Sequence, residues 1–225
     1  MFTNNDTAYE TAISLNKSGV AINSVIDIRD KSNSSIVKKA EKLGIKIHWR
    51  HTVINTNGYK KISSIELMKL SDDGAAVVGN KLKEECDCLG ISGGWTPRVH
   101  LFTQSGGKLK FRDKDNIFIP DKSESEQISI GSCNGDFELD DVIKNSNKSI
   151  KEFLNVNSSD YENLEINCSK ETDKKNIWLL PSNKPLGKTK PFLDFQNDST
   201  AKDVKLALSE GFKSIEHVKR YTTTG

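Results

Sequence analysis

The sequence predicts an α/β fold, because helical and strand-like segments alternate in the first third of the chain. Residues 6–19 and 35–44 carry apolar side chains at helical spacing. Residues 20–28 and 45–49 are short apolar runs typical of strands. Strands separated by helices favour parallel pairing through right-handed crossovers. We therefore expect a parallel sheet covered by helices, the pattern of a nucleotide-binding domain.

The first predicted helix has a clear inner face and a clear end. Ala8, Ala12 and Leu15 lie on one side at helical spacing, with Ile13 beside them. Gly19 follows as a stop signal, and the strand-like run begins directly after it. The predicted order is therefore helix, strand, helix, strand over residues 6–49.

An antiparallel addition is predicted after these elements. Residues 60–70 alternate apolar and polar side chains, with Ile62, Ile65 and Leu67 as an apolar set that is shifted once. A DDG turn and an AVV run follow. This pattern predicts a hairpin. Residues 86–92, CDCLGIS, are expected to return as a short buried strand.

The turn before the first helix lacks the glycines of a dinucleotide site. Such sites use G-x-G-x-x-G, because glycines let a pyrophosphate approach the helix amides. Here the turn reads TNNDTA, with Thr3 and Asn5 in place of the first two glycines. Asp6 adds a carboxylate that would repel a phosphate. Asp27 ends the second strand, where a ribose-binding acid would lie. We favour a fold kept without this ligand, and dinucleotide binding by the turn stays open.

The cysteines and histidines do not indicate a metal or catalytic site. Cys86 and Cys88 form a C-x-C pair, Cys133 and Cys168 are isolated, and there is no C-x-x-C pair. Zinc and iron–sulfur ligation are therefore poorly supported. C-x-C on a strand places both thiols on one face, which favours a buried structural role. No nucleophile–base pair or carboxylate dyad is recognisable, so we assign no catalytic residue and no metal ligand.

Charge and hydropathy give little indication of partners. The net charge of +2 over 225 residues offers no general case for nucleic acid or an anionic membrane. No apolar run reaches the roughly 18 residues of a membrane span, and the N-terminus has no signal-peptide pattern. We expect a cytoplasmic location, with no nucleic-acid or membrane partner.

Several motifs together resemble a known family. Residues 86–111, CDCLGISGGWTPRVHLFTQSGGKLKF, are similar to the return crossover of glutathione-reductase-like flavoproteins, where a strand ends in a glycine-containing turn followed by Pro. The later IGSCNG, residues 130–135, resembles the closing segment of that fold. The motifs SGGWTP, HLFTQSGGKL and EHVKRYTT narrow the resemblance to the alpha subunit of heterotetrameric sarcosine oxidase, over nearly the whole chain.

The resemblance implies an α/β, Rossmann-like three-layer fold of the NAD/FAD-binding type with a small helical C-terminal module. It divides the chain into an inserted Rossmann-like domain (1–95), a return segment of the first NAD-binding domain (96–154), a linker (155–190) and a truncated helical module (191–225). A central fragment of a longer subunit is expected, lacking its glycine-rich NAD loop and its folate-binding domain.

The small module resembles the helical [2Fe–2S] domain of bacterioferritin-associated ferredoxin. Asp194 and Gln196 stand where related dehydrogenases carry two cysteines, before Ser199 and Thr200. Because carboxylate and amide cannot replace thiolates, no cluster is expected. Thr200 and Asp203 have capping-box spacing, which predicts a helix start in a structural joint.

By resemblance, the function is oxidative demethylation of sarcosine to glycine, with tetrahydrofolate accepting the one-carbon unit. The family implies NAD in the alpha subunit, with its site incomplete here, and FAD and FMN in the whole complex. Beta, gamma and delta subunits are the implied partners. The chain alone is expected to be inactive.

The resemblance also suggests cofactor-binding residues. Backbone amides in glycine-containing turns can approach a dinucleotide closely. Contact with NAD and simple chain reversal remain two open interpretations of these turns. The candidates are Gly93, Gly94, Ser132, Cys133, Asn134 and Gly135.

Two alternative functions remain. One is an electron-transfer or scaffold subunit of an opine- or proline-dehydrogenase-type complex. The other is a stand-alone interaction module that kept the fold and lost its cofactor. A stable monomer would favour the module, whereas exposed apolar surface would favour part of a larger enzyme.

Overall fold

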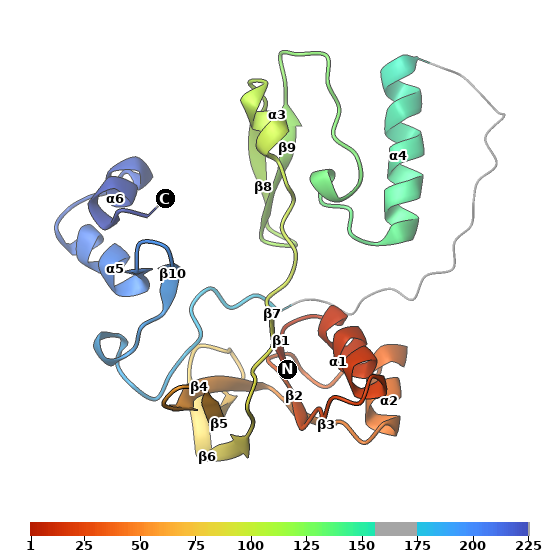
Figure 1. Ribbon diagram of the computed structural model, residues 1–225. Helices are drawn as coiled ribbons and strands as arrows, with labels where there is room; N and C mark the ends of the chain where they lie inside the picture. The colour runs from red at the N-terminus through yellow and green to blue at the C-terminus, as the bar shows by residue number, and fades with distance from the viewer. Residues whose placement is uncertain (156–174, 225) are drawn as a thin grey trace. The chain divides into compact units, whose positions relative to one another are not determined.

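A computed structural model describes residues 1–155 and 175–224 (Figure 1). The chain divides into two compact units. The first contains Met1–His51 and Cys86–Asn176, and the second contains Thr52–Glu85 and Ile177–Gly225. We describe each unit by itself.

The first unit is built on a four-stranded parallel sheet with the order β3-β2-β1-β7. Phe2 of β1 pairs with Ile26 of β2 on one side and with Ile91 of β7 on the other. The chain therefore moves outward from β1 to β3 and later returns to the opposite side of β1. The strands are β1 (Phe2–Thr3), β2 (Ser24–Asp27), β3 (Lys46–Trp49) and β7 (Ile91–Ser92).

Two helices bury the apolar residues of this sheet. They are α1 (Thr7–Lys17) and α2 (Ser35–Lys42), which lie together in Figure 1. The Ser34 side chain caps α2 by accepting a hydrogen bond from the Val37 amide at 3.4 Å. The predicted α/β class and Rossmann-like arrangement are confirmed. The core cluster consists of Tyr9, Ala12, Ile13, Val25, Val37, Ala40 and Ile45.

The inner face of α1 differs in detail from the prediction. Ala8, Ala12 and Ile13 are buried as expected, but Leu15 is 37% exposed. Tyr9 is fully buried instead. The buried face of α1 is therefore rotated to include Tyr9, whose hydroxyl requires a hydrogen-bond partner.

The expected strand over residues 86–92 is wrong for most of its length. β7 has two residues because its partner β1 has two, Phe2 and Thr3. Cys86 is half-buried and Cys88 is exposed, and neither lies in a strand. The buried structural role expected for the C-x-C pair is therefore not found.

The rest of the first unit forms smaller elements. The β8–β9 hairpin is antiparallel, and Phe111 and Phe118 meet across it edge to face, with ring centroids 5.1 Å apart. The elements are α3 (His100–Gln104), β8 (Lys108–Arg112), β9 (Ile117–Lys122), the 3₁₀ turn η1 (Gly131–Asn134) and α4 (Leu139–Leu154).

The second unit contains the predicted hairpin and one strand more. β5 (Ile62–Leu70) and β6 (Val77–Glu85) pair antiparallel as expected, and β4 (His51–Gly58), which was not predicted, joins β5. The register of β5 shifts between Leu67 and Lys69. This bulge explains the single shift in the apolar pattern, because Leu67 and Met68 are both buried.

The helical module of this unit begins with a short hairpin. Asp203 accepts hydrogen bonds from the Thr200 amide at 2.8 Å and from its hydroxyl at 2.7 Å, so the predicted helix start is confirmed. Ala207 and Val218 are buried, whereas Leu208 and Ile215 are 56% and 82% exposed. The elements are η2 (Leu186–Lys188), β10 (Phe192–Asp194), β11 (Ser199–Thr200), α5 (Ala201–Ser209) and α6 (Ile215–Thr222).

The predicted linker, residues 155–190, lies largely outside the described residues. Its described part, residues 175–190, contains no strand and only the short turn η2. Trp178, in this described part, is 75% exposed. The division into four segments drawn from the resemblance remains a prediction.

The cap of α5 predicts a pH dependence. Hydrogen bonds from the Thr200 side chain and amide lower the pKa of Asp203. A carboxyl that is more acidic in the folded state stabilises fully above its unfolded pKa, and this contribution disappears as pH falls through the folded value. Helicity of the protein should therefore fall more steeply below about pH 4 than in Asp203→Asn, as followed by circular dichroism.

Glu210→Gln is the matched control for this measurement, because Glu210 is exposed at the other end of α5. It should keep the acid transition of the wild-type protein. Identical acid transitions in the wild type and Asp203→Asn would contradict the proposed contribution of the cap.

Candidate functional site

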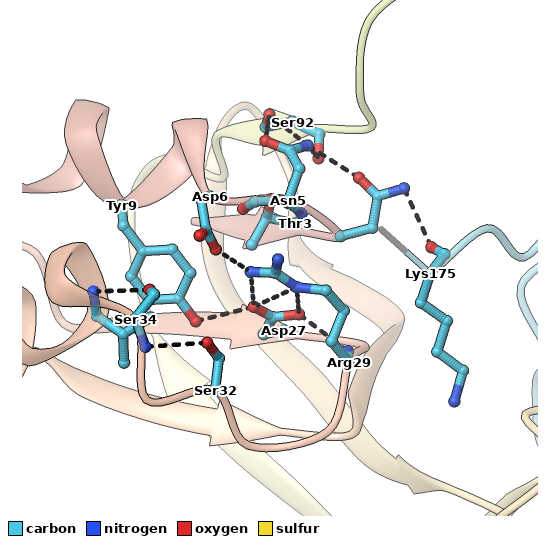
Figure 2. A network of polar contacts seen from close by, with 12 residues as sticks. Thr3, Asn5, Asp6, Tyr9, Asp27, Arg29, Ser32, Ser34, Ser92 and Lys175 are labelled. Carbon is cyan, nitrogen blue, oxygen red and sulfur yellow. Dashed lines mark hydrogen bonds and ion pairs between the residues drawn. The ribbon is translucent and has the colours of Figure 1, made fainter. Parts of the chain in front are cut away.

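The candidate site is the edge of the parallel sheet where β1, β2 and β7 end. The chain leaves β1 toward β2 on one side and returns as β7 on the other, which makes β1 the switch point. Ligands of open α/β sheets bind at the carboxyl ends of strands at such a point. The residues gathered there come from the β1–α1 turn, the end of β2 and the end of β7 (Figure 2).

The β1–α1 turn satisfies its own backbone groups. The Asn5 amide donates to the Thr3 hydroxyl at 3.1 Å, and that hydroxyl donates to the Asn5 carbonyl at 3.0 Å. The Asn5 side-chain oxygen accepts from the Thr7 amide at 3.1 Å and from its hydroxyl at 2.5 Å. The amides of Asn5 and Thr7 are therefore bound by side chains of the same turn.

Asn5 also joins the turn to β7. Its side-chain amide donates to the Ser92 carbonyl at 3.2 Å and to the Ser92 hydroxyl at 3.1 Å. It also donates to the Asn4 side-chain oxygen at 2.9 Å. Because Asn5 is fully buried, this side chain fills the space between the ends of β1 and β7.

A buried ion cluster lies beside the turn. Asp27, which is fully buried, accepts hydrogen bonds from the Arg29 amide at 2.9 Å, from Arg29 Nε at 3.1 Å and from Arg29 Nη2 at 2.8 Å. The Tyr9 hydroxyl donates to the same carboxylate at 2.8 Å. Arg29 Nη2 also reaches Asp6 at 2.8 Å. Two carboxylates and one guanidinium thus share one site.

The cluster raises the pKa values of Arg29 and Tyr9. Burial by itself would lower the pKa of Arg29, but hydrogen bonds and charge contacts with Asp27 and Asp6 outweigh it and raise this pKa. Burial, together with the charge and hydrogen bond of Asp27, raises the pKa of Tyr9 far above its usual range. Tyr9 is therefore a permanent donor, which does not suit it to proton transfer.

The residues at this edge do not fit a dinucleotide. A pyrophosphate needs free amides and close backbone approach, but the Thr3 and Asn5 side chains bind the Asn5 and Thr7 amides and occupy the turn. A ribose hydroxyl needs an accessible acid, but Asp27 is fully buried. The two carboxylates of the cluster also oppose the approach of a phosphate to this edge.

The two glycines carried over from the family lie next to the β1–α1 turn. Gly93 and Gly94 follow β7 and are exposed. A Cβ on Gly94 would lie 3.8 Å from the Asn4 side-chain oxygen, and Gly94 has a φ of +105°. This conformation favours glycine, so chain reversal accounts for Gly94 without a ligand.

The SCNG turn lies against a different element. Ser132, Cys133 and Asn134 belong to η1, and Gly135 follows with a φ of +79°. The Gly135 carbonyl accepts a hydrogen bond from Arg112 Nη2 of β8 at 2.7 Å. A Cβ on Gly135 would lie 2.8 Å from Arg112 Nη2, so close packing explains this glycine. The two candidate turns therefore contact different parts of the chain: Gly94 lies near Asn4, and Gly135 contacts Arg112.

Asn134 borders an open cavity in the first unit. The cavity has a volume of about 430 Å³ and combines aromatic, acidic and amide side chains. Ser132 and Cys133 are exposed, whereas Asn134 is half-buried. Among the four residues of the SCNG turn, Asn134 lines this cavity. Its neighbours in the lining include Phe102, Asp121, Gln127, Glu152 and Phe153.

Sequence reasoning missed Tyr9 and Arg29. Arg29 follows Asp27 by two residues, and in an extended segment residues two apart point to the same side. That D-x-R spacing was a usable signal for a charge pair. Tyr9 gave no such signal, because pairing of a helix residue with the end of β2 depends on the packed fold.

The described residues contain no group of three or more His, Cys, Asp or Glu side chains that could hold a metal ion. At the expected position of a cluster cysteine, Asp194 Oδ1 accepts from the Gln196 amide at 2.8 Å, and Asp194 Oδ2 accepts from the Asn197 side chain at 2.8 Å. The loop is thus closed by a hydrogen-bonded turn. Within the described residues, no helix is long and apolar enough to cross a membrane.

The parallel sheet and its switch point define a protein of the Rossmann-like class. Residues 188–225 match the sarcosine oxidase A3 domain family. The chain is also similar to three curated proteins named sarcosine oxidase subunit alpha. Identity is 28% over 230 residues for Corynebacterium sp. strain P-1, 27% over 228 residues for Corynebacterium sp. strain U-96 and 27% over 237 residues for Rhizobium meliloti strain 1021.

These matches cover 98%, 98% and 100% of this chain, and 23%, 23% and 22% of the respective relatives. The chain therefore spans less than a quarter of the length of the relatives. The resemblance to sarcosine oxidase alpha subunits, predicted from the motifs, is confirmed over nearly the whole chain.

Solved structures with similar folds include two oxidoreductases. L-proline dehydrogenase from P. horikoshii has a TM-score of 0.48 and 18% identity, over 93% of this chain and 42% of that one. Thioredoxin reductase from T. acidophilum has a TM-score of 0.45 and 16% identity, over 68% of this chain and 51% of that one.

The ion cluster predicts a large effect of one substitution. Arg29→Met should lower the free energy of unfolding by about 3–5 kcal/mol, because it leaves Asp27 buried and uncompensated. Urea denaturation followed by fluorescence measures this change. Arg220→Met is the control, since Arg220 pairs with Glu216 on the surface and its side chain is 75% exposed. It should change the same quantity by about 1 kcal/mol or less.

If both substitutions change stability equally, the cluster is not the anchor that its geometry indicates. Arg29→Lys refines the result. A single ammonium group replaces a fork that contacts both carboxylates, so this variant should fall between the wild type and Arg29→Met.

The packing of Gly135 predicts a second stability effect. Gly135→Ala should destabilise the protein by roughly 1–3 kcal/mol, because φ is positive and the new methyl group would press on Arg112 and Ile117. Gly93→Ala is the control, because no atom lies within 4 Å of the added Cβ. Thermal unfolding compares the two variants, and equal midpoints would contradict the packing role.

Proposed function

We propose that this chain is part of the alpha subunit of a sarcosine oxidase-type enzyme. The observation that carries the proposal is its similarity to three such alpha subunits over 98–100% of its length. The match of residues 188–225 to the sarcosine oxidase A3 domain supports it independently. Because the chain spans less than a quarter of these relatives, the activity is proposed for the larger assembly.

In this proposal, the whole complex oxidises sarcosine to glycine, tetrahydrofolate accepts the one-carbon unit and oxygen accepts the electrons. FAD, FMN and folate are bound outside this chain. The chain itself acts as a scaffold. In the site described above, Tyr9 and Asp27 are committed to the buried cluster, so neither is available as an acid or base.

We assign the NAD contacts of this scaffold to the glycine-containing turn at Ser132–Gly135, because Gly93 and Gly94 follow β7 at the sheet edge that does not fit a dinucleotide. Asn134 is the best-placed side chain, because it lines the cavity of about 430 Å³ and keeps an amide that can bind ribose or phosphate oxygens. Gly135 supports the turn by packing and is not itself a contact.

Contacts with the rest of the enzyme are assigned to helix α4. None of its 16 residues is buried, although its sequence is amphipathic. Ile150, Phe153 and Leu154 are 40%, 46% and 59% exposed. Apolar side chains grouped near one helix end mark an interaction surface. We propose that the missing parts of the alpha subunit, or the beta, gamma and delta subunits, cover it.

The test is to purify the protein that contains this chain, under native conditions, from cells that encode it. Sarcosine-dependent oxygen uptake with formation of glycine is the expected result. Tetrahydrofolate should divert the one-carbon unit from formaldehyde to methylene-tetrahydrofolate. Oxidation of proline or an opine, but not of sarcosine, would replace the proposal with the dehydrogenase alternative. A stable monomer without bound cofactor would indicate an interaction module.

Asn134 provides a specific prediction. Asn134→Ala should lower the NAD content of the purified complex several-fold, because it removes one direct polar contact worth about 1 kcal/mol. NAD released by denaturation and measured by chromatography gives this ratio. Asn147→Ala is the control, since Asn147 is exposed on α4 and does not line the cavity. Equal NAD in both variants and the wild type would argue against Asn134 as a contact.

A further inference from the structure

We infer that the carboxyl edge of the parallel sheet is closed by its own charges and binds no dinucleotide. In this arrangement, Asp6 occupies the place of a phosphate at the start of α1, and Arg29 compensates its charge. The chain thus fills, with its own ion cluster, the position where a nucleotide would bind in an open α/β sheet.

The position of Asp6 supports the first part of the inference. It directly precedes Thr7, the first residue of an 11-residue helix, where anions bind favourably. Its side chain is only 10% exposed and contacts Arg29 Nη2 at 2.8 Å. An anion from solution would have to displace a carboxylate that is covalently held beside the helix start and already paired.

The position of Arg29 supports the second part. Its side chain is 5% exposed and bridges Asp6 of the turn and Asp27 of β2. Nη2 donates to both carboxylates at 2.8 Å, while Nε donates to Asp27 (Figure 2). Opening the site would break this bridge and leave a buried carboxylate without a compensating charge.

The outer side of the turn is covered by the same chain. The Asn4 side-chain amide donates to the Lys175 carbonyl at 3.2 Å and to the Asn176 side-chain oxygen at 3.4 Å. Figure 2 shows Lys175 on the side of the turn away from Tyr9. Asn176 also donates to the Asp115 carbonyl at 3.3 Å. Residues 175 and 176 are thus hydrogen-bonded to the β1–α1 turn, and Asn176 is also hydrogen-bonded to Asp115.

The test is hydrogen–deuterium exchange of the purified protein, with its accompanying subunits, with and without millimolar NAD⁺. Exchange in peptides covering residues 3–9 and 26–30 should not change when NAD⁺ is added. NAD⁺-dependent protection of these two peptides that is lost in Asp27→Asn would overturn the inference. The measurement is local, so it does not depend on whether the enzyme is active.

The same experiment separates this inference from the proposed function. Protection confined to residues 131–136 would support the proposed NAD contacts and agree with a closed sheet edge. No protection in any peptide would count against those NAD contacts and would still agree with the closed edge.

Arg29→Lys provides a second readout in case Asp27→Asn does not fold. The shorter ammonium group should loosen the bridge and speed exchange of residues 3–9 and 26–30 by at least several-fold, without making that exchange sensitive to NAD⁺. NAD⁺-dependent slowing in this variant to the wild-type rate would show that the edge accepts the dinucleotide, and would overturn the inference.

Discussion

The bridge from Arg29 to Asp27 and Asp6 is the interaction on which the first unit depends. It connects the end of β2 with the turn that leads from β1 into α1, and Tyr9 adds a hydrogen bond from within the helix. Each charged side chain is nearly or fully buried, so removing one leaves its partner uncompensated and lowers the stability of the fold. The bridge thereby ties two strands and one helix together at the edge where a Rossmann-like sheet ordinarily meets its ligand.

This constraint accounts for the unusual sequence of the turn. The Thr7 amide, the first of α1, and the Asn5 amide before it need partners, and the Asn5 and Thr3 side chains provide them. Glycines in these positions would leave the amides without side-chain acceptors. The same residues that weaken the case for a dinucleotide are therefore those that stabilise the fold without one. In the proposed enzyme, the cofactor and subunit contacts are assigned to other parts of the chain, the Ser132–Gly135 turn and helix α4.

Much of the fold could be predicted from periodicity and turn chemistry. The helices at residues 6–19 and 35–44, the strands around them and the Thr200 cap depend on local signals, and the structure contains them. The length of β7 could not be predicted, because it is set by its two-residue partner β1. The cluster could be predicted only in part. Asp6 and Asp27 were recognised as acids, but the contact of Arg29 with Asp6 and that of the Tyr9 hydroxyl with Asp27 depend on packing between distant segments.

The loop at Asp194 in the small module is closed by hydrogen bonds between residues that are close in sequence. The Asp194 carboxylate accepts hydrogen bonds from Gln196 and Asn197, two and three residues further along the chain. Because the bonded groups are at most three residues apart in sequence, this loop can close early in folding, before distant elements of the module meet.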